Sequence, residues 1–302
     1  MAENQPGSCD GVCSGCSVGD CDSRSAAPKP KARKNIKHTV GVVSGKGGVG
    51  KSLVTCLIAD ELVKKGYKVG ILDADITGPS IPKEYGMTGR LSADDNGINP
   101  AVTHNGIKVM SVNLMLPQDD MPVAWRGPVI TGILNQFLDE TNWEDIDYLL
   151  VDMPPGTSDV FLTVMHSFDL DGIITVSAPQ ELVAMIVGKA VNLAHDMNVP
   201  VLGLVENMAY FKCDECGKEH FIFGEPQGKV VAKRYQIPAL ATLPIDPVFT
   251  NLSDAGKIDQ YDVEGKLDDI LEQIEVAARQ KDAKRAAEAE KADAEEAAPA
   301  AN

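Results

Sequence analysis

The chain has 302 residues, of which 44% are hydrophobic, and a formal net charge of −16 at pH 7. This apolar content suffices for a sizeable core and excludes a wholly disordered chain. The acidic excess argues against non-specific binding to nucleic acid, and no apolar run reaches the roughly 18 residues of a membrane-spanning helix.

Composition divides the chain into three zones. Residues 1–35 are rich in Gly, Ser, Cys and Asp and end in Pro, Lys and Arg, which predicts a flexible cysteine-rich arm and a basic linker. Residues 36–277 carry the apolar periodicity of a globular domain. Residues 278–302 are rich in Ala and Glu, and we expect an acidic tail that extends the last helix and then frays. The first residues lack the pattern of a secretory signal, so we expect a cytoplasmic protein.

Short apolar runs alternate with longer mixed segments through the globular zone. We predict strands at residues 39–43, 67–72, 107–112, 148–151, 172–176, 199–205 and 239–243. We predict helices at residues 52–65, 129–140, 181–197, 228–235 and 263–277. Near-continuous apolar strands that alternate with helices indicate an α/β fold with a doubly wound, mainly parallel sheet.

A phosphate-binding loop follows the first predicted strand. The pattern G-x-x-x-x-G-K-S/T is met there, between a strand and a helix, by Gly45-Lys46-Gly47-Gly48-Val49-Gly50-Lys51-Ser52. The glycines let backbone N–H groups curl around phosphates, and the start of the helix adds a partial positive charge. We expect Lys51 to reach the β- and γ-phosphates of ATP and Ser52 to supply a hydroxyl to Mg²⁺.

Acidic residues follow two of the predicted strands. Asp73 and Asp75 end the second strand, and Asp152 ends the strand at residues 148–151. The carboxyl ends of parallel strands converge on the ligand crevice of a doubly wound sheet. We interpret Asp152 as the carboxylate that holds Mg²⁺ and Asp75 as the group that polarises the attacking water. Asp73 stays open as an alternative to Asp75 or as a brace for the loop.

A second lysine, Lys46, lies inside the loop. The string Lys-Gly-Gly-x-Gly-Lys-Ser resembles the deviant Walker A motif of the MinD/ParA and nitrogenase iron-protein class. The resemblance implies a P-loop NTPase whose extra lysine reaches the phosphates held by the partner subunit of a nucleotide-sandwich dimer. It therefore implies that Lys46 is a catalytic cation acting in trans, comparable to an arginine finger.

Further motifs narrow the resemblance. The strings at residues 73–82, 125–128, 151–159, 178–180 and 205–208 resemble the Mrp/ApbC family of iron–sulfur cluster carriers, over roughly residues 38–260. This resemblance implies a cytoplasmic, homodimeric ATPase that binds a labile [4Fe–4S] cluster and passes it to apoproteins. It also implies contacts with the adenine ring at Asn207 and at Asp246, in a Leu-Pro-Ile-Asp turn.

Cys213 and Cys216 form a Cys-x-x-Cys pair in a polar segment. Two ligands are too few for a closed tetrahedral site, but a two-fold dimer brings four thiolates together for one bridging [4Fe–4S] cluster. Together with the family resemblance, this favours the cluster. A redox-active pair, and a zinc site with His220 as third ligand, stay open as alternatives.

The chain has further cysteines outside this pair. Four lie near the start of the sequence, at Cys9, Cys13, Cys16 and Cys21. Their number suits a second [4Fe–4S] cluster or a zinc site, and the spacing does not choose between a cluster, zinc and an arm without metal. Cys56 lies within the first predicted helix, and we interpret it as a small buried hydrophobic residue.

We therefore predict an ATP-hydrolysing carrier that assembles a labile [4Fe–4S] cluster at a homodimer interface and passes it to apoproteins, with neither nucleic acid nor membrane as a partner. The alternative is a MinD/ParA-type positioning ATPase with a zinc-binding or redox Cys-x-x-Cys pair. Membrane binding by MinD needs a basic amphipathic helix at the C-terminus, and the Ala- and Glu-rich end of this chain lacks an apolar stripe.

Overall fold

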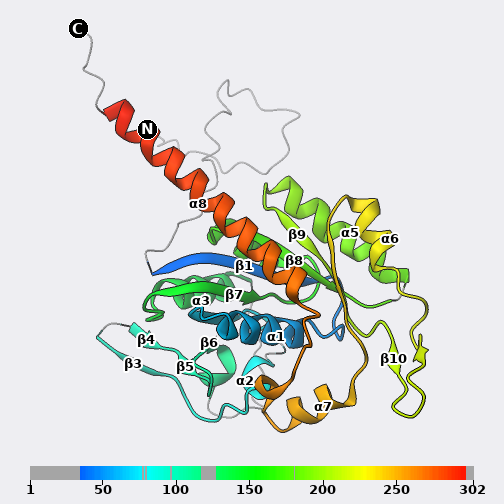
Figure 1. Ribbon diagram of the computed structural model, residues 1–302. Coiled ribbons are helices and arrows are strands. Elements are labelled where there is room, and N and C mark those ends of the chain that lie inside the picture. The colour runs from blue at the N-terminus through cyan, green and yellow to red at the C-terminus, as the bar shows by residue number, and fades with distance from the viewer. Residues whose placement is uncertain are drawn as a thin grey trace, which may run out of the picture.

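The computed structural model describes residues 35–76, 78, 80–95, 97–116, 127–179 and 181–296. Its centre is an 8-stranded sheet with the strand order β12-β9-β8-β1-β7-β2-β6-β5 (Figure 1). All neighbouring strands run parallel except β5 and β6. The predicted doubly wound, mainly parallel α/β fold is confirmed.

The strands of the central sheet are β1 Ile36–Ser44, β2 Val69–Asp73, β5 Ala101–Val102, β6 Lys108–Ser111, β7 Ile146–Asp152, β8 Gly172–Ser177, β9 Val201–Glu206 and β12 Ala239–Thr242. Two hairpins stand apart from it, β3 Ser92–Asp94 with β4 Gly97–Asn99 and β10 Phe211–Lys212 with β11 Glu219–His220. The α-helices are α1 Lys51–Lys64, α2 Ile81–Glu84, α3 Gly127–Asp139, α4 Asp159–Ser167, α5 Glu181–Asp196, α6 Gly228–Tyr235, α7 Pro247–Asp254 and α8 Asp268–Glu296. In the part of the chain that the structure describes, no helix combines the length and the apolar character needed to cross a bilayer.

Helices cover both faces of the sheet (Figure 1), and the buried apolar side chains of the described residues form two large hydrophobic cores and a smaller cluster between β9, α5 and α6. One core lies between the sheet and α1, α7 and α8, and the other between the sheet and α3, α4 and α5. The middle of β7, residues 148–151, is wholly apolar because Tyr148 and Leu150 enter the first core while Leu149 and Val151 enter the second. Both faces of this strand are therefore buried.

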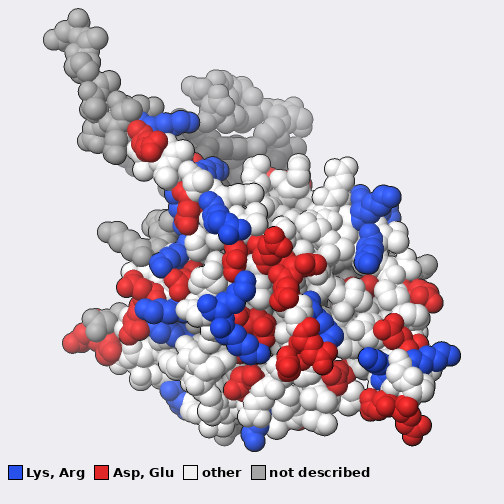
Figure 2. Space-filling model, viewed as in Figure 1, with Lys and Arg blue, Asp and Glu red and all other residues white. Residues whose placement is uncertain are grey.

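The last helix differs from its predicted bounds of 263–277. Glu264 and Gly265 have φ of 50° and 73°, so the backbone turns through the left-handed region before α8 begins. α8 then continues to Glu296 and projects beyond the rest of the fold (Figure 1). The middle of α8 is fixed by Asp169, which forms ion pairs with Lys281 and with Arg285 of the helix. The Arg285 Nη2 atom lies 2.8 Å from Asp169 Oδ2. On the face shown in Figure 2, basic and acidic side chains are interspersed along this helix.

Candidate functional site

The phosphate-binding loop joins β1 to α1 at the carboxyl edge of the sheet. Gly48 and Gly50 have φ of 80° and 79°, in the left-handed region that favours glycine. A Cβ atom at position 50 would also lie 2.2 Å from Asn207 Nδ2. Glycine is therefore required at this position both for the backbone conformation and for the close contact with Asn207.

A cavity of about 270 Å³ lies against this loop. Its lining includes Gly47, Gly48, Gly50, Lys51, Ser52, Asp75 and Pro155. Gly45 and Lys46 come just before these residues in the loop, and the Lys46 side chain is exposed. The start of α1 faces this cavity, so backbone N–H groups and the partial positive charge of the helix are available to an anion.

Lys51, Ser52 and Asp152 form one polar cluster although Asp152 comes from a different strand. Lys51 Nζ lies 2.7 Å from Asp152 Oδ2, and the Ser52 hydroxyl donates to the same oxygen over 2.5 Å. Asp152 is completely buried and Lys51 is 6% exposed, so these charges face each other largely shielded from water. The structure thus brings together the predicted phosphate-binding lysine, hydroxyl and carboxylate.

Thr55 is a member of this cluster that the sequence analysis missed. Its hydroxyl donates to Asp152 Oδ1 over 2.9 Å and lies 3.0 Å from the carbonyl oxygen of Lys51, one helical turn earlier. The one available signal was its spacing of four residues from Lys51, which places both on the same side of α1. Each carboxylate oxygen of Asp152 therefore accepts a side-chain hydrogen bond from α1.

Asp73, the last residue of β2, and Asp75, two residues later, occupy different surroundings. Asp73 is fully buried, and its carboxylate accepts hydrogen bonds from Ser111 Oγ at 3.1 Å and from the backbone N–H of Asp75 at 3.2 Å. Burial, reinforced by the negative charge of Asp152, raises the pKa of Asp73 to about 8. Asp75 instead lines the cavity, with Oδ2 at 4.0 Å from Lys51 Nζ. Of the two, Asp75 is the one at the cavity, and Asp73 braces its backbone.

The two residues implied as adenine contacts, Asn207 and Asp246, are not among the residues that line the phosphate cavity. Asn207 is 1% exposed, and its Nδ2 donates to the carbonyl oxygen of Val49 over 3.0 Å. Asp246 caps α7 by accepting from the Val248 N–H at 2.9 Å, and it accepts from the Tyr261 hydroxyl at 2.8 Å. Their contacts with adenine stay predictions, whereas their structural contacts are with the loop and with α7.

Cys213 and Cys216 lie in the tight turn that joins β10 to β11. The turn is closed by hydrogen bonds from the Cys213 N–H to the Lys218 carbonyl oxygen, 3.0 Å, and from the Gly217 N–H to the Cys213 carbonyl oxygen, 2.8 Å. Cys213 is partly buried and Cys216 is exposed. The backbone N–H groups of Cys216 and Glu215 lower the pKa of the Cys213 thiol, which favours the thiolate that binds metals.

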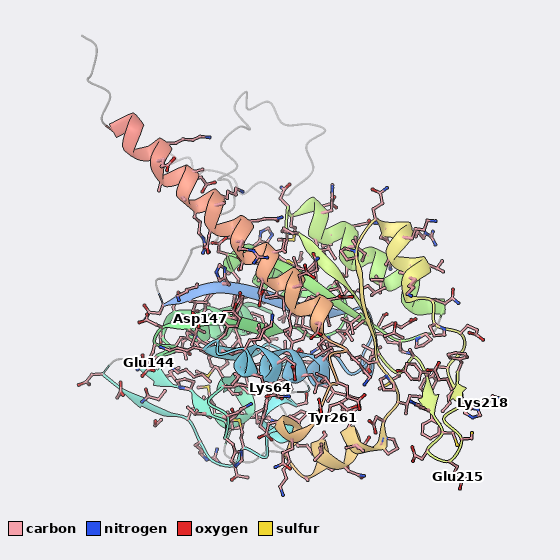
Figure 3. The ribbon with its side chains drawn as sticks, in the orientation of Figure 1. Lys64, Glu144, Asp147, Glu215, Lys218 and Tyr261 are labelled. Carbon is pink, nitrogen blue, oxygen red and sulfur yellow. The ribbon has the colours of Figure 1, made fainter. Side chains whose placement is uncertain are left out.

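This pair has too few neighbours to form a closed metal site within one chain. Among the described residues, no group of three or more His, Cys, Asp or Glu side chains gathers as a candidate metal site. His220 therefore does not complete a three-ligand zinc site with Cys213 and Cys216 in the described structure. Figure 3 shows Glu215 and Lys218 on the same turn, at the edge of the molecule.

The other cysteines fall into two groups. The N-terminal residues Cys9, Cys13, Cys16 and Cys21, with their predicted cluster or zinc, lie outside the described residues. Cys56 is 0% exposed within α1, which confirms its interpretation as a buried residue. Burial raises the pKa of its thiol.

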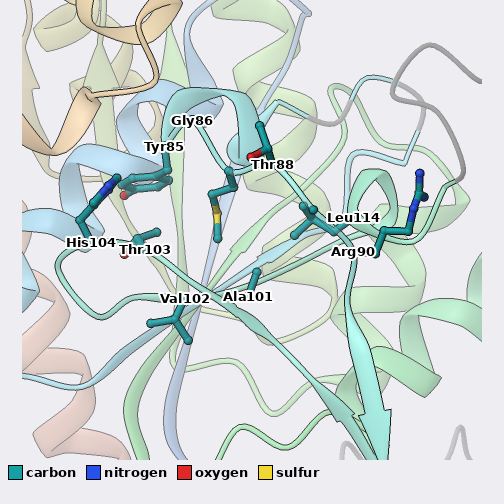
Figure 4. Close-up of a pocket in the computed structure, with 11 residues that line it drawn as sticks. Tyr85, Gly86, Thr88, Arg90, Ala101, Val102, Thr103, His104 and Leu114 are labelled. Carbon is teal, nitrogen blue, oxygen red and sulfur yellow. The ribbon is translucent and has the colours of Figure 1, made fainter.

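A further cavity of about 350 Å³ was not indicated by any sequence pattern. It lies between the segment that follows α2 and the segment that includes β5 (Figure 4). The residues around it include Tyr85, Thr88, Arg90, Val102 and His104. Because its walls come from separate parts of the chain, local periodicity carries no signal for it.

Comparison with known proteins relates this geometry to a family. The family model for the ParA-type NUBPL iron-transfer P-loop NTPase matches residues 35–277. A protein from Clostridium perfringens named "Iron-sulfur cluster carrier protein" is 47% identical over 261 residues, which cover 84% of this chain and 92% of that protein. A protein of the same name from Saccharolobus solfataricus is 46% identical over 226 residues, covering 74% of this chain and 76% of its own length.

Solved structures agree with this relationship. A nucleotide-binding protein from Archaeoglobus fulgidus in complex with ADP has a TM-score of 0.69 and 44% identity, covering 76% of this chain and 90% of that chain. The cell-division ATPase MinD from Pyrococcus furiosus has a TM-score of 0.57 at 19% identity, covering 79% of this chain and 98% of that chain, and shares the fold. With its phosphate loop, its buried Lys51–Asp152 pair and the match over its globular part, the chain belongs to the NUBPL iron-transfer P-loop NTPase family.

Proposed function

We propose that this chain is an ATP-hydrolysing iron–sulfur cluster carrier that works as a homodimer in the cytoplasm and passes a labile [4Fe–4S] cluster to apoproteins. The observation that carries the proposal is that one chain combines a phosphate-binding loop with an accessible pair of cysteines in a tight turn. The name shared by the relatives from Clostridium perfringens and Saccharolobus solfataricus supports the same activity.

In the nucleotide half of the site, the loop glycines and the start of α1 bind the phosphates. Lys51 neutralises the β- and γ-phosphates, for which it exchanges its contact with Asp152. The Ser52 hydroxyl and the Asp152 carboxylate are adjacent oxygen ligands of the kind that Mg²⁺ prefers, so these residues fit that ion. When bound, Mg²⁺ neutralises negative charge on the phosphates. Asn207 and Asp246 contact the adenine ring in this proposal, as the resemblance to related ATPases implies.

Two further residues act on the reacting groups. Asp75 lines the cavity and orients the water that attacks the γ-phosphate. Lys46 acts across the dimer and stabilises the charge that develops on the phosphates bound by the other subunit. Its exposed position in the loop is suited to contact with a second copy of the chain.

In the cluster half, each subunit contributes Cys213 and Cys216. A two-fold axis near the turn gives four thiolates, the number that holds a [4Fe–4S] cluster. The N–H groups of Cys216 and Glu215 favour the thiolate of Cys213, and the exposed edge position gives an apoprotein access to the cluster. The cysteines at positions 9, 13, 16 and 21 would form a second site for a cluster or zinc.

The first experiment is anaerobic reconstitution with iron and sulfide, with the iron and acid-labile sulfide counted per dimer. We expect about four irons per dimer in the wild type, lost in the double variant Cys213→Ala/Cys216→Ala. Cys56→Ala is the matched control, because Cys56 is buried far inside α1, and it should keep the iron. A form lacking residues 1–22 measures any iron held by the N-terminal cysteines.

Bound zinc without labile sulfide in every form would contradict the carrier and favour a positioning ATPase. The link to ATP is tested with Lys51→Ala, which should load a cluster but lose its delivery to an apoprotein. Undiminished delivery by this variant would show that transfer does not depend on ATP.

A further inference from the structure

A short segment joins the phosphate loop to the cysteine turn. Asn207 follows β9 directly, and its side-chain amide donates to Val49 of the loop. Residues 208–210 alone separate Asn207 from β10, and Cys213 follows the last residue of β10. The two halves of the site are therefore connected both by a hydrogen bond and by a few residues of continuous backbone.

The loop end of this segment is tightly packed. Asn207 is almost completely buried, and its backbone N–H donates to the Ser177 carbonyl oxygen over 2.8 Å. Its Nδ2 atom lies 2.2 Å, and Met208 Cε lies 3.9 Å, from the point that a Cβ of Gly50 would occupy. When the loop closes around phosphates, there is thus no free space between Gly50 and Asn207 to absorb a movement of the backbone.

The middle of the segment is also restrained. Met208 has φ of 56°, a left-handed conformation that a non-glycine residue adopts at a cost. The Ala209 N–H donates to the Leu243 carbonyl oxygen over 2.9 Å, and the Ile245 N–H donates to the Tyr210 carbonyl oxygen over 2.6 Å. A displacement at Asn207 therefore passes along a held backbone towards β10 rather than being lost in a loose loop.

The cysteine end, in contrast, has room to move. A cavity of about 380 Å³ is lined by residues 210–214 on one side and by residues 244–247 and Tyr261 on the other. Cys213 lines this cavity. Because Cys213 is partly buried against this cavity, a change in the turn changes the access of a reagent to its sulfur.

From these contacts we propose that Asn207 is a positioning residue that couples the two sites. Occupation of the phosphate loop shifts Asn207 and, through Met208, the β10–β11 turn, so that nucleotide binding alters the reactivity of the Cys213 thiol. This inference rests on the proposed function, because it assigns the regulation of the same cysteines. It predicts that the response exists in the metal-free protein, before any cluster is loaded.

The test follows alkylation of Cys213 by iodoacetamide in the metal-free, full-length protein, resolved at the level of peptides by mass spectrometry. The rate is compared without nucleotide, with Mg-ADP and with a non-hydrolysable ATP analogue, each at a concentration shown by titration to saturate the variant in use. In the wild type we expect nucleotide to change the rate about fivefold or more. The alkylation of buried Cys56 should not change.

Two variants interrupt the connection at different points. Asn207→Ala removes the hydrogen bond to Val49 and should abolish the response at equal nucleotide occupancy. Met208→Gly keeps that amide but frees the restrained backbone, and should reduce the response. The matched control is Tyr261→Phe, which removes a hydrogen bond to Asp246 on the opposite wall of the cavity and should keep the full response.

Several outcomes would overturn the inference. A wild type that binds nucleotide without any change at Cys213 refutes it, while the carrier proposal still stands on its iron and sulfide content. A full response in both Asn207→Ala and Met208→Gly also refutes it, as does an equal loss in Tyr261→Phe, which would indicate general loosening. A wild type that does not bind nucleotide at all contradicts both proposals.

Discussion

We predict that the protein loses stability as the pH rises, because the carboxyl group of Asp60 is buried. Asp60 lies in α1 and is 3% exposed. Its Oδ1 accepts hydrogen bonds from Asn105 Nδ2 at 2.8 Å and from the Tyr85 hydroxyl at 3.1 Å, whereas the buried Oδ2 has no hydrogen-bond partner within the described structure. Burial outweighs these hydrogen bonds and raises the pKa of Asp60 from 3.8 to about 7.

Stability falls with rising pH because the folded protein holds the proton of Asp60 more tightly than the unfolded chain does. Because the pKa of Asp60 is higher in the folded state, its contribution to stability is complete below about pH 4 and is lost as the pH rises through about 7. A difference of about three units between the folded and unfolded pKa corresponds to about 4 kcal/mol in the free energy of unfolding. About 2.5 kcal/mol of this is lost between pH 5 and pH 8. Above pH 8 this group makes no further change.

Urea denaturation of the wild type and of Asp60→Asn at pH 5 and pH 8 isolates the effect. The variant keeps the Oδ1 acceptor for Asn105 and Tyr85 but has no proton to lose in this range. We expect the free energy of unfolding of the wild type, relative to Asp60→Asn, to fall by about 2.5 kcal/mol between the two pH values. A difference that stays the same at both pH values would refute the reasoning, since every other titrating group is common to the two proteins.

Three further predictions concern the nucleotide site. Lys51→Ala should lower the rate of ATP hydrolysis by about 100-fold or more, and a rate near that of the wild type in a phosphate-release assay would contradict its role. Gly50→Ala should weaken binding of a fluorescent ADP analogue, because the new methyl group is forced against Asn207 at a positive φ, and unchanged affinity would show that the loop can relax. Thr55→Val should lower the free energy of unfolding by about 1–3 kcal/mol because it leaves Asp152 Oδ1 without its hydroxyl donor, while the Thr55→Ser control should retain most of the stability in urea.

The nucleotide half of the site was predictable because its signals are local. A strand, a glycine-rich turn and a helix follow one another at positions 36–64, and the glycine at position 50 is needed by the backbone itself. The carboxylates at the ends of β2 and β7 were also predictable, since parallel strands share one carboxyl edge. The sequence favoured Asp75 but left Asp73 open, because the two residues are close neighbours at the end of one strand and their different burial shows only in the structure.

Other elements depended on contacts that the sequence does not display. The predicted helix at residues 263–277 was wrong at its start, because Glu264 and Gly265 turn the backbone before α8. The hairpin of β10 and β11 has strands too short for any periodicity. The second cavity gathers walls from three separate segments, so no local pattern describes it.

The sequence by itself therefore determined the α/β class, the phosphate loop and the residue types of its chemistry, because each follows from a local repeat or a contiguous motif. The tertiary structure alone decided the strand order, the hydrogen bonds from Ser52 and Thr55 to Asp152, and the placement of Asn207 against the loop. These contacts join residues about 100 or more positions apart in the chain, so they exist only after the sheet has brought the ends of its strands together.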